Sequence, residues 1–122
     1  MRIFIADDSP ALMESLKTIL SEIEGLEIVG KAGNSVEAIK GVNSLKPDVV
    51  ILDIRLGEGN GILALENIKK MKDPPLVVMF TNFPYLQYRK RCKDAGADYF
   101  FYKAIEFKEL INLIKKLSKT GY

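Results

Sequence analysis

The chain has 122 residues, of which 48% are hydrophobic and 28% charged, which suits one globular domain, and its net charge of +2 argues neither for nor against a nucleic-acid partner. It has no histidine and one cysteine, which excludes histidine-based metal sites, Ser-His-Asp triads and an internal disulfide, and favours an intracellular setting. No apolar run approaches the roughly 20 residues of a membrane span, and the N-terminus has no secretory signal pattern, so we expect a cytoplasmic protein.

Strand-like and helix-like patterns alternate five times along the chain. Short apolar runs predict strands at residues 2–6, 27–32, 49–52, 76–80 and 99–102. Apolar residues at helical spacing follow each run, and the predicted helices begin near Ser9-Pro10, Asn34-Ser35, Ile62, Pro84 and Glu106. The alternation predicts an α/β fold in a single domain over residues 1–122, with a parallel sheet covered by helices on both faces.

Two segments carry more specific expectations. In the second predicted helix, Val36, Ile39, Val42 and Leu45 recur every three residues, and we expect them to drift around one face of the helix. Residues 56–60 contain two glycines and follow a buried strand, and we expect them to form a glycine-rich loop.

Polar side chains stand at the ends of four predicted strands. Asp7 and Asp8 follow the first strand, Asp53 the third, Thr81 the fourth and Lys103 the fifth. Parallel strands bring these ends to one edge of the sheet, which is where ligands bind in open α/β sheets. Three carboxylates together repel one another and require a cation or protons, and oxygen ligands in a wet cleft favour Mg²⁺. With a lysine and a hydroxyl beside it, a carboxylate there is suited to attack on phosphorus.

Each of these residues has a plainer role when taken alone. A carboxylate at a strand end is more often a helix cap, a threonine there is more often part of a turn, and a lysine is more often solvated. Their joint occurrence favours a shared site.

Three other classes of protein fit the sequence less well. Gly57, Gly59 and Gly61 have the wrong spacing for the fingerprint of a dinucleotide-binding protein. Aspartate-nucleophile phosphatases separate their two acids by one residue, and flavodoxins need a hydroxyl-rich loop after the first strand.

The same motifs closely resemble the receiver domain of two-component response regulators. The resemblance rests on the acid pair after the first strand, Asp53 after VVIL, Thr81 after LVVMF, and the GADYFFYK segment that ends in Lys103. It covers the whole chain. It implies the flavodoxin-like, doubly wound (βα)₅ fold with five parallel strands in the order 2-1-3-4-5, as in the chemotaxis member of that family.

The resemblance also implies roles for the acid site. Asp53 would accept a phosphoryl group. Asp8 would bind Mg²⁺ directly, Asp7 would bind it through water, and Arg55 would offer its backbone carbonyl to the same ion. Lys103 would pair with a phosphoryl oxygen. These residues, with Asp53 itself as a ligand, make up the expected metal and phosphorylation site.

A switch is implied as well. Thr81 would bind a phosphoryl oxygen, and Phe100 stands where the family has its switch aromatic, which turns inward behind the threonine. This movement would change the shape of the surface formed by the fourth helix, the fifth strand and the fifth helix. Arg55 and Phe83 would flank the path of the water that removes the phosphoryl group.

The implied function is that of a stand-alone receiver, phosphorylated on Asp53 by a sensor histidine kinase or a phosphotransfer protein. It would promote only its own phosphotransfer and dephosphorylation, so we expect no enzyme acting on a separate substrate. Output would pass to a downstream protein, or to a second copy of the chain, through the changed surface. We expect no direct binding to nucleic acid or membrane, because no separate DNA-binding motif remains once the five strand–helix units are counted and no apolar run is long enough to span a membrane.

The alternative is a receiver-like interaction scaffold that is not phosphorylated. The basic run at residues 89–93, with Tyr85 and Tyr88 nearby, would then serve as a partner surface or a weak nucleic-acid patch. Such a run is more often a solvated helix face.

Overall fold

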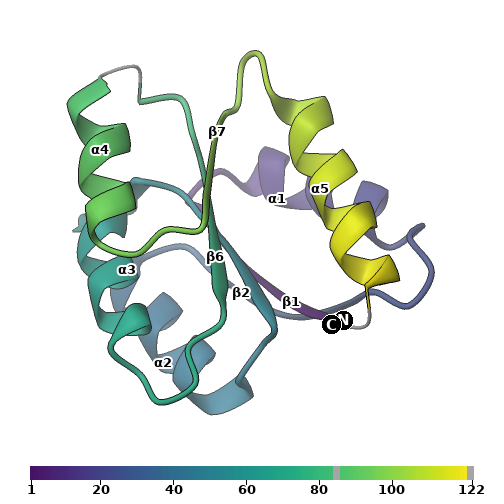
Figure 1. The fold of residues 1–122 in the computed structure, drawn as a ribbon, viewed down its shortest axis with the longest axis horizontal. Helices are drawn as coiled ribbons and strands as arrows, with labels where there is room; N and C mark the ends of the chain where they lie inside the picture. Colours follow the sequence, from purple (N-terminus) through teal and green to yellow (C-terminus); the bar gives the residue numbers. More distant parts are fainter. Residues whose placement is uncertain (84–85, 121–122) are drawn as a thin grey trace.

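The centre of the molecule is a parallel sheet with helices on both faces (Figure 1). This computed structural model describes residues 1–83 and 86–120. The sheet consists of β1 (Arg2–Ala6), β2 (Glu27–Ala32), β3 (Val49–Leu52), β6 (Leu76–Thr81) and β7 (Tyr99–Tyr102). Its spatial order is β2-β1-β3-β6-β7, and every neighbouring pair is parallel. The predicted order 2-1-3-4-5 is confirmed, with β6 and β7 as the fourth and fifth predicted strands.

The helices of the described residues are α1 (Pro10–Leu20), α2 (Ser35–Leu45), α3 (Gly61–Lys69), α4 (Leu86–Asp94) and α5 (Phe107–Lys119). In Figure 1, α1 and α5 lie on one side of the sheet, and α2, α3 and α4 lie on the other. The predicted starts at Ser9 and Asn34 are confirmed, because both side chains accept a backbone hydrogen bond from the first turn of their helix. The predicted start at Pro84 lies outside the described residues, as does Tyr85. None of these helices is long and apolar enough to cross a membrane.

Two apolar cores lie on opposite faces of the sheet, and consecutive strand residues alternate between them. In β3, Val50 and Leu52 belong to the core with α2, α3 and α4, whereas Val49 and Ile51 belong to the core with α1 and α5. All four residues are at most 2% exposed. Burial on both faces explains why the β3 sequence is apolar throughout. Packing from both sides therefore holds the carboxyl end of β3 in place.

One position of α2 differs from its prediction. Val36 is 60% exposed, and the residues that α2 buries are Ser35, Ala38 and Val42. A spacing of three residues falls about 60° short of a helical turn, so Val36 lies about 120° around the axis from Val42. The prediction that Val36 shares the core-facing side is therefore wrong, whereas Ile39 is partly buried against the core.

Residues 56–60 form more than a loop. β4 (Arg55–Leu56) and β5 (Gly59–Asn60) pair as a short antiparallel hairpin, with Leu56 opposite Gly59. Leu56 is fully buried, and a Cβ on Gly59 would overlap the hydroxyl of Ser35. Gly57 has a φ of +60°, a left-handed conformation that glycine adopts at little cost. The expected loop is therefore corrected to a hairpin that packs closely against the start of α2.

Candidate functional site

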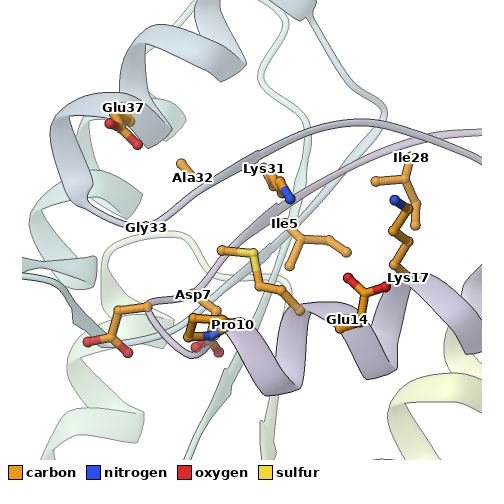
Figure 2. Close-up of a pocket in the computed structure, with 12 residues that line it drawn as sticks. Ile5, Asp7, Pro10, Glu14, Lys17, Ile28, Lys31, Ala32, Gly33 and Glu37 are labelled. Atoms are coloured by element: carbon orange, nitrogen blue, oxygen red, sulfur yellow. The ribbon is translucent and has the colours of Figure 1, made fainter.

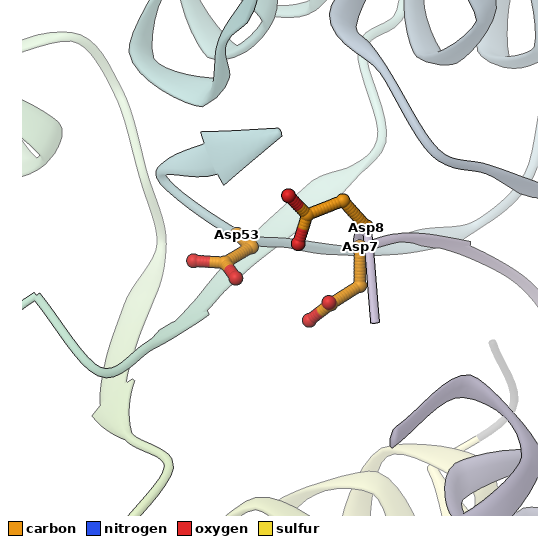
Figure 3. A group of neighbouring side chains, drawn as sticks. All are labelled: Asp7, Asp8 and Asp53. Atoms are coloured by element: carbon orange, nitrogen blue, oxygen red, sulfur yellow. The ribbon is translucent and has the colours of Figure 1, made fainter. Parts of the chain in front are cut away.

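Three carboxylates meet where β1 and β3 end. These strands are neighbours, and Ala6 is paired with Leu52. Asp7, Asp8 and Asp53 directly follow this pair and therefore lie next to one another. One oxygen of each carboxylate lies within 4.8 Å of the others (Figure 3). Asp7 and Asp53 are buried, whereas Asp8 is exposed. The structure thus brings together three residues that are separated by up to 46 positions in the sequence.

Backbone hydrogen bonds orient the two buried carboxylates. The Asp53 N–H donates to the Ala6 carbonyl at 3.0 Å, which continues the β1–β3 pairing beyond both strands. Oδ1 of Asp7 accepts from the Ser9 N–H at 2.8 Å, and Oδ1 of Asp53 accepts from the Arg55 N–H at 3.3 Å. Each side chain is therefore fixed at its backbone and at one oxygen, which leaves its second oxygen for other partners.

Lys103 supplies that partner for both carboxylates. Its Nζ lies 2.6 Å from Oδ2 of Asp7 and 2.7 Å from Oδ2 of Asp53. Burial raises the pKa of Asp7, although the hydrogen bond from Lys103 acts to lower it. Burial acts to lower the pKa of Lys103, but the hydrogen bonds to Asp53 and Asp7 outweigh it and the pKa is raised. Lys103 is therefore charged at neutral pH, as a single ammonium beside three acids.

This group of residues is suited to hold a divalent cation. Three carboxylates beside a single ammonium repel one another in a largely buried site, and such a cluster attracts a cation. All the side-chain donors are oxygens, the ligand type that Mg²⁺ prefers. Asp8 is exposed, so an ion here would keep the water ligands that Mg²⁺ gives up reluctantly.

A pocket of about 500 Å³ lies at the same edge of the sheet. Five of the predicted site residues line it together with Asn82 and Phe83, namely Asp8, Asp53, Arg55, Thr81 and Lys103. The side chain of Thr81 is buried, and its Oγ1 accepts from the Phe83 N–H at 3.2 Å. Asp7 is joined to the pocket through Lys103. The pocket therefore offers a hydroxyl, an ammonium and two carboxylates to a small anion and its metal ion.

Phe100 lies apart from this pocket. It is a half-buried residue of β7 that packs against the core on the α4 side of the sheet. The guanidinium of Arg89, from α4, lies 5.2 Å from the centroid of its ring. The sequence analysis assigned Phe100 to a switch behind the acid site, and its position beside α4 is compatible with that assignment.

Gly61 is a residue that the sequence analysis missed. It is the first residue of α3, directly after the Asn60 cap, and its N–H donates to the Ile54 carbonyl at 2.7 Å. A Cβ at this position would overlap the carbonyl oxygen of Asp53. The close approach of α3 to the chain after β3 therefore requires glycine. The available signal was a glycine between a helix cap and the first apolar residue of a helix.

A second pocket, of about 400 Å³, also touches the acid pair (Figure 2). It lies between α1, β2 and the start of α2, and apolar side chains such as Ile5 and Ile28 line part of it. Glu14, Lys17 and Lys31 also line it, so its charges are mixed. This pocket lacks the convergence of charge and hydroxyl groups that distinguishes the first one.

The pocket lined by Asp8 and Asp53, which we call the acid pocket, extends from the ends of β1 and β3, where the strand order reverses, to the ends of β6 and β7. Fold and pocket together therefore define an α/β protein of the doubly wound class, which binds its ligands at such a switch point. Within this class, the family model of the response regulator receiver domain matches residues 3–115. The chain belongs to the response regulator receiver family, as the resemblance of its motifs predicted.

Individual relatives agree with this assignment. The sensory transduction protein LytT of Bacillus anthracis is 30% identical over 119 residues, which are 98% of this chain and 48% of that protein. The response regulator domain of Thermotoga maritima CheB has a TM-score of 0.85 at 28% identity, covering 98% of this chain and 94% of that one. A chain of the CheX-CheY-BeF₃-Mg²⁺ complex from Borrelia burgdorferi has a TM-score of 0.86 at 26% identity, covering 96% and 88%. The chain spans about half the length of the first curated relatives it matches.

Proposed function

We propose that the chain accepts a phosphoryl group on Asp53 in a Mg²⁺-dependent reaction, and that a sensor histidine kinase or a phosphotransfer protein supplies it. The observation that carries this proposal is the placement of Lys103 within 2.7 Å of both Asp7 and Asp53, beside the exposed carboxylate of Asp8. An isolated ion pair needs one carboxylate for one lysine. Three carboxylates around one lysine are suited to a metal ion and a transferred anion.

The reaction joins an oxygen of the Asp53 carboxylate to phosphorus. The phosphorus–nitrogen bond of a phosphohistidine breaks as the new oxygen–phosphorus bond forms, and the electron pair of the broken bond stays on the imidazole nitrogen. The hydrogen bonds to Asp53 hold the attacking carboxylate in one orientation, so positioning contributes to the rate.

The remaining residues neutralise charge. Asp7, Asp8, Asp53 and the Arg55 carbonyl would hold Mg²⁺, which supplies positive charge to the phosphoryl oxygens. Lys103 would move its hydrogen bond from Asp53 to a phosphoryl oxygen, and the Thr81 hydroxyl would donate to another. Arg55 and Phe83 line the same pocket and would limit the approach of water, which sets the lifetime of the phosphorylated state.

Phosphorylation would be read out beside the site. Thr81 would move toward the phosphoryl group and Phe100 would turn inward, which changes the surface formed by α4, β7 and α5. A downstream protein or a second copy of the chain would bind this surface. The chain acts on its own aspartate in this scheme and has no separate substrate.

The test is intact-mass measurement after incubation with a small-molecule phosphodonor, with and without Mg²⁺. We expect the mass of one phosphoryl group to be gained with Mg²⁺ and to be absent in Asp53→Ala. Asp94→Ala is the matched control, because Asp94 is an exposed residue of α4 that pairs with Lys90, and it should be phosphorylated normally. No gain under any condition would contradict the proposal and favour the non-phosphorylated scaffold.

A further inference from the structure

Arg89 lies over two aromatic rings of β7, and the proposed function does not use it. Its guanidinium carbon is 5.2 Å from the centroid of the Phe100 ring and 5.6 Å from that of the Tyr102 ring. The two rings meet edge to face at 5.2 Å. We call these three side chains the Arg89 stack. Because a guanidinium is attracted to the faces of aromatic rings at such distances, the stack ties α4 to β7.

The stack lies on a helix that buries few side chains completely. Within Leu86–Asp94, the buried residue is Cys92, whereas the equally long α3 buries five residues. Arg89 itself is exposed, and Phe100 and Tyr102 are half-buried. A helix with so few buried apolar side chains shifts at low cost in free energy. The contacts of Arg89 therefore add to those of Cys92 and the partly buried Tyr88 in holding α4 against the sheet.

Strand pairing connects the stack to the acid pocket. Tyr102 is the partner of Thr81 in the β6–β7 register, and the Lys103 N–H donates to the Thr81 carbonyl at 2.9 Å. Phe100 and Tyr102 are two residues apart, so they lie on the same side of β7. A movement of Thr81 or Lys103 at the pocket therefore acts directly on the strand that carries both rings.

We propose that Arg89 is a positioning residue that holds Phe100 in its half-buried place and so opposes the phosphorylated arrangement. The inference rests on the proposed function. When Phe100 turns inward, its ring leaves the guanidinium, so this part of the stack exists in only one of the two arrangements. Removing a contact made only in the unphosphorylated arrangement raises the affinity for any ligand that favours the other.

The test compares BeF₃⁻ binding, measured by calorimetry in excess Mg²⁺, between the unchanged chain and Arg89→Met. Methionine keeps an unbranched apolar side chain and removes the guanidinium. We expect binding to be about fivefold tighter in Arg89→Met, with Arg89→Lys in between. Lys93→Met is the matched control, because it removes an exposed cation from the same helix, and its affinity should be unchanged.

Thermal unfolding without BeF₃⁻ separates this role from a merely structural one. Arg89→Met should unfold at a lower temperature than the unchanged chain and yet bind BeF₃⁻ more tightly. Loss of a merely structural residue would lower stability without making BeF₃⁻ binding tighter. Equal or weaker binding in Arg89→Met, with normal binding by the unchanged chain, would overturn the role of Arg89 alone. Failure of the unchanged chain to bind BeF₃⁻ would overturn the proposed function and this inference with it.

Discussion

Gly61 gives a sharp test of how the acid site is built, because a methyl group there meets backbone rather than a flexible side chain. In Gly61→Ala the new Cβ would overlap the carbonyl oxygen of Asp53 and lie 2.7 Å from its carbon and 2.8 Å from the Cα of Ile54. Ordinary carbon–carbon contacts are about 3.5 Å or longer, so the backbone has to move by about 1 Å. Such a movement would stretch the 2.7 Å hydrogen bond from the Gly61 N–H to the Ile54 carbonyl.

The expected loss follows from these contacts. Overpacking costs about 1–3 kcal/mol, a weakened buried hydrogen bond adds about 1 kcal/mol, and the better helix propensity of alanine returns up to about 1 kcal/mol. Gly61→Ala should therefore lower the free energy of unfolding by about 2 kcal/mol, or roughly 6–10 °C in Tm for a chain of this size.

Urea unfolding followed by circular dichroism measures the effect. Gly33→Ala is the matched control, because its Cβ would meet no atom within 4 Å, and it should change the free energy by less than about 0.5 kcal/mol. The same unfolding midpoint for Gly61→Ala and the unchanged chain would refute the argument that the approach of α3 to Asp53 requires glycine.

Ionisable groups elsewhere give further tests. Asp98→Ala should lower the free energy of unfolding by about 1–2 kcal/mol, because Oδ2 of Asp98 accepts from the Val77 N–H at 2.8 Å. Asp94→Ala removes only an exposed ion pair and should cost less than about 0.5 kcal/mol, so equal losses in urea unfolding would contradict this reasoning. Cys92 is fully buried, and burial raises the pKa of its thiol to about 11. A thiol reagent at pH 8 should therefore label Cys92 only after the chain unfolds, and fast labelling of the folded chain would disprove this. Burial raises the pKa of Asp7, so the folded chain binds the carboxyl proton of Asp7 more tightly than the unfolded chain does. Ionisation of Asp7 therefore lowers the free energy of unfolding, and this loss is complete above the folded pKa. In Mg²⁺-free buffer, Asp7→Asn should therefore be more stable at pH 7, and its advantage should shrink as pH falls through the raised pKa; an advantage that stays constant into acid would count against burial as the cause.

The strands and helix starts could be predicted because local chemistry decides them. The Val49–Leu52 run is apolar at every position because both faces of β3 are covered, and length and flanking residues identify it without tertiary information. The hydroxyl of Ser9 caps α1 and Pro10 is its first residue, which is a local interaction as well. The order of the strands came from the resemblance, since periodicity alone does not determine which strands are neighbours.

The contacts that build the site were beyond the sequence pattern. That Lys103 binds Asp7 and Asp53 at the same time depends on the twist and register of three strands, which spacing does not encode. The role of Gly61 was overlooked because a glycine after a helix cap does not by itself indicate a close approach to Asp53, which is a tertiary contact. Val36 was misplaced because apolar residues spaced three apart match a helical pattern over one turn. Over several turns, the same spacing moves them around the axis and away from the buried side of α2.

The uneven packing of the sheet indicates where a charge change at Asp53 is accommodated. Under the proposed function, a phosphoryl group on Asp53 would bring about two negative charges to a site that already contains Asp7 and Asp8. β3 is the less adjustable element, because its four residues are packed on both faces, whereas α4 is held by the buried Cys92, the partly buried Tyr88 and the Arg89 stack. The lowest-cost response therefore lies at β7 and α4. Because linkage is reciprocal, a partner that bound the rearranged α4 surface in this scheme would favour the phosphorylated form by the same factor by which phosphorylation favoured the partner.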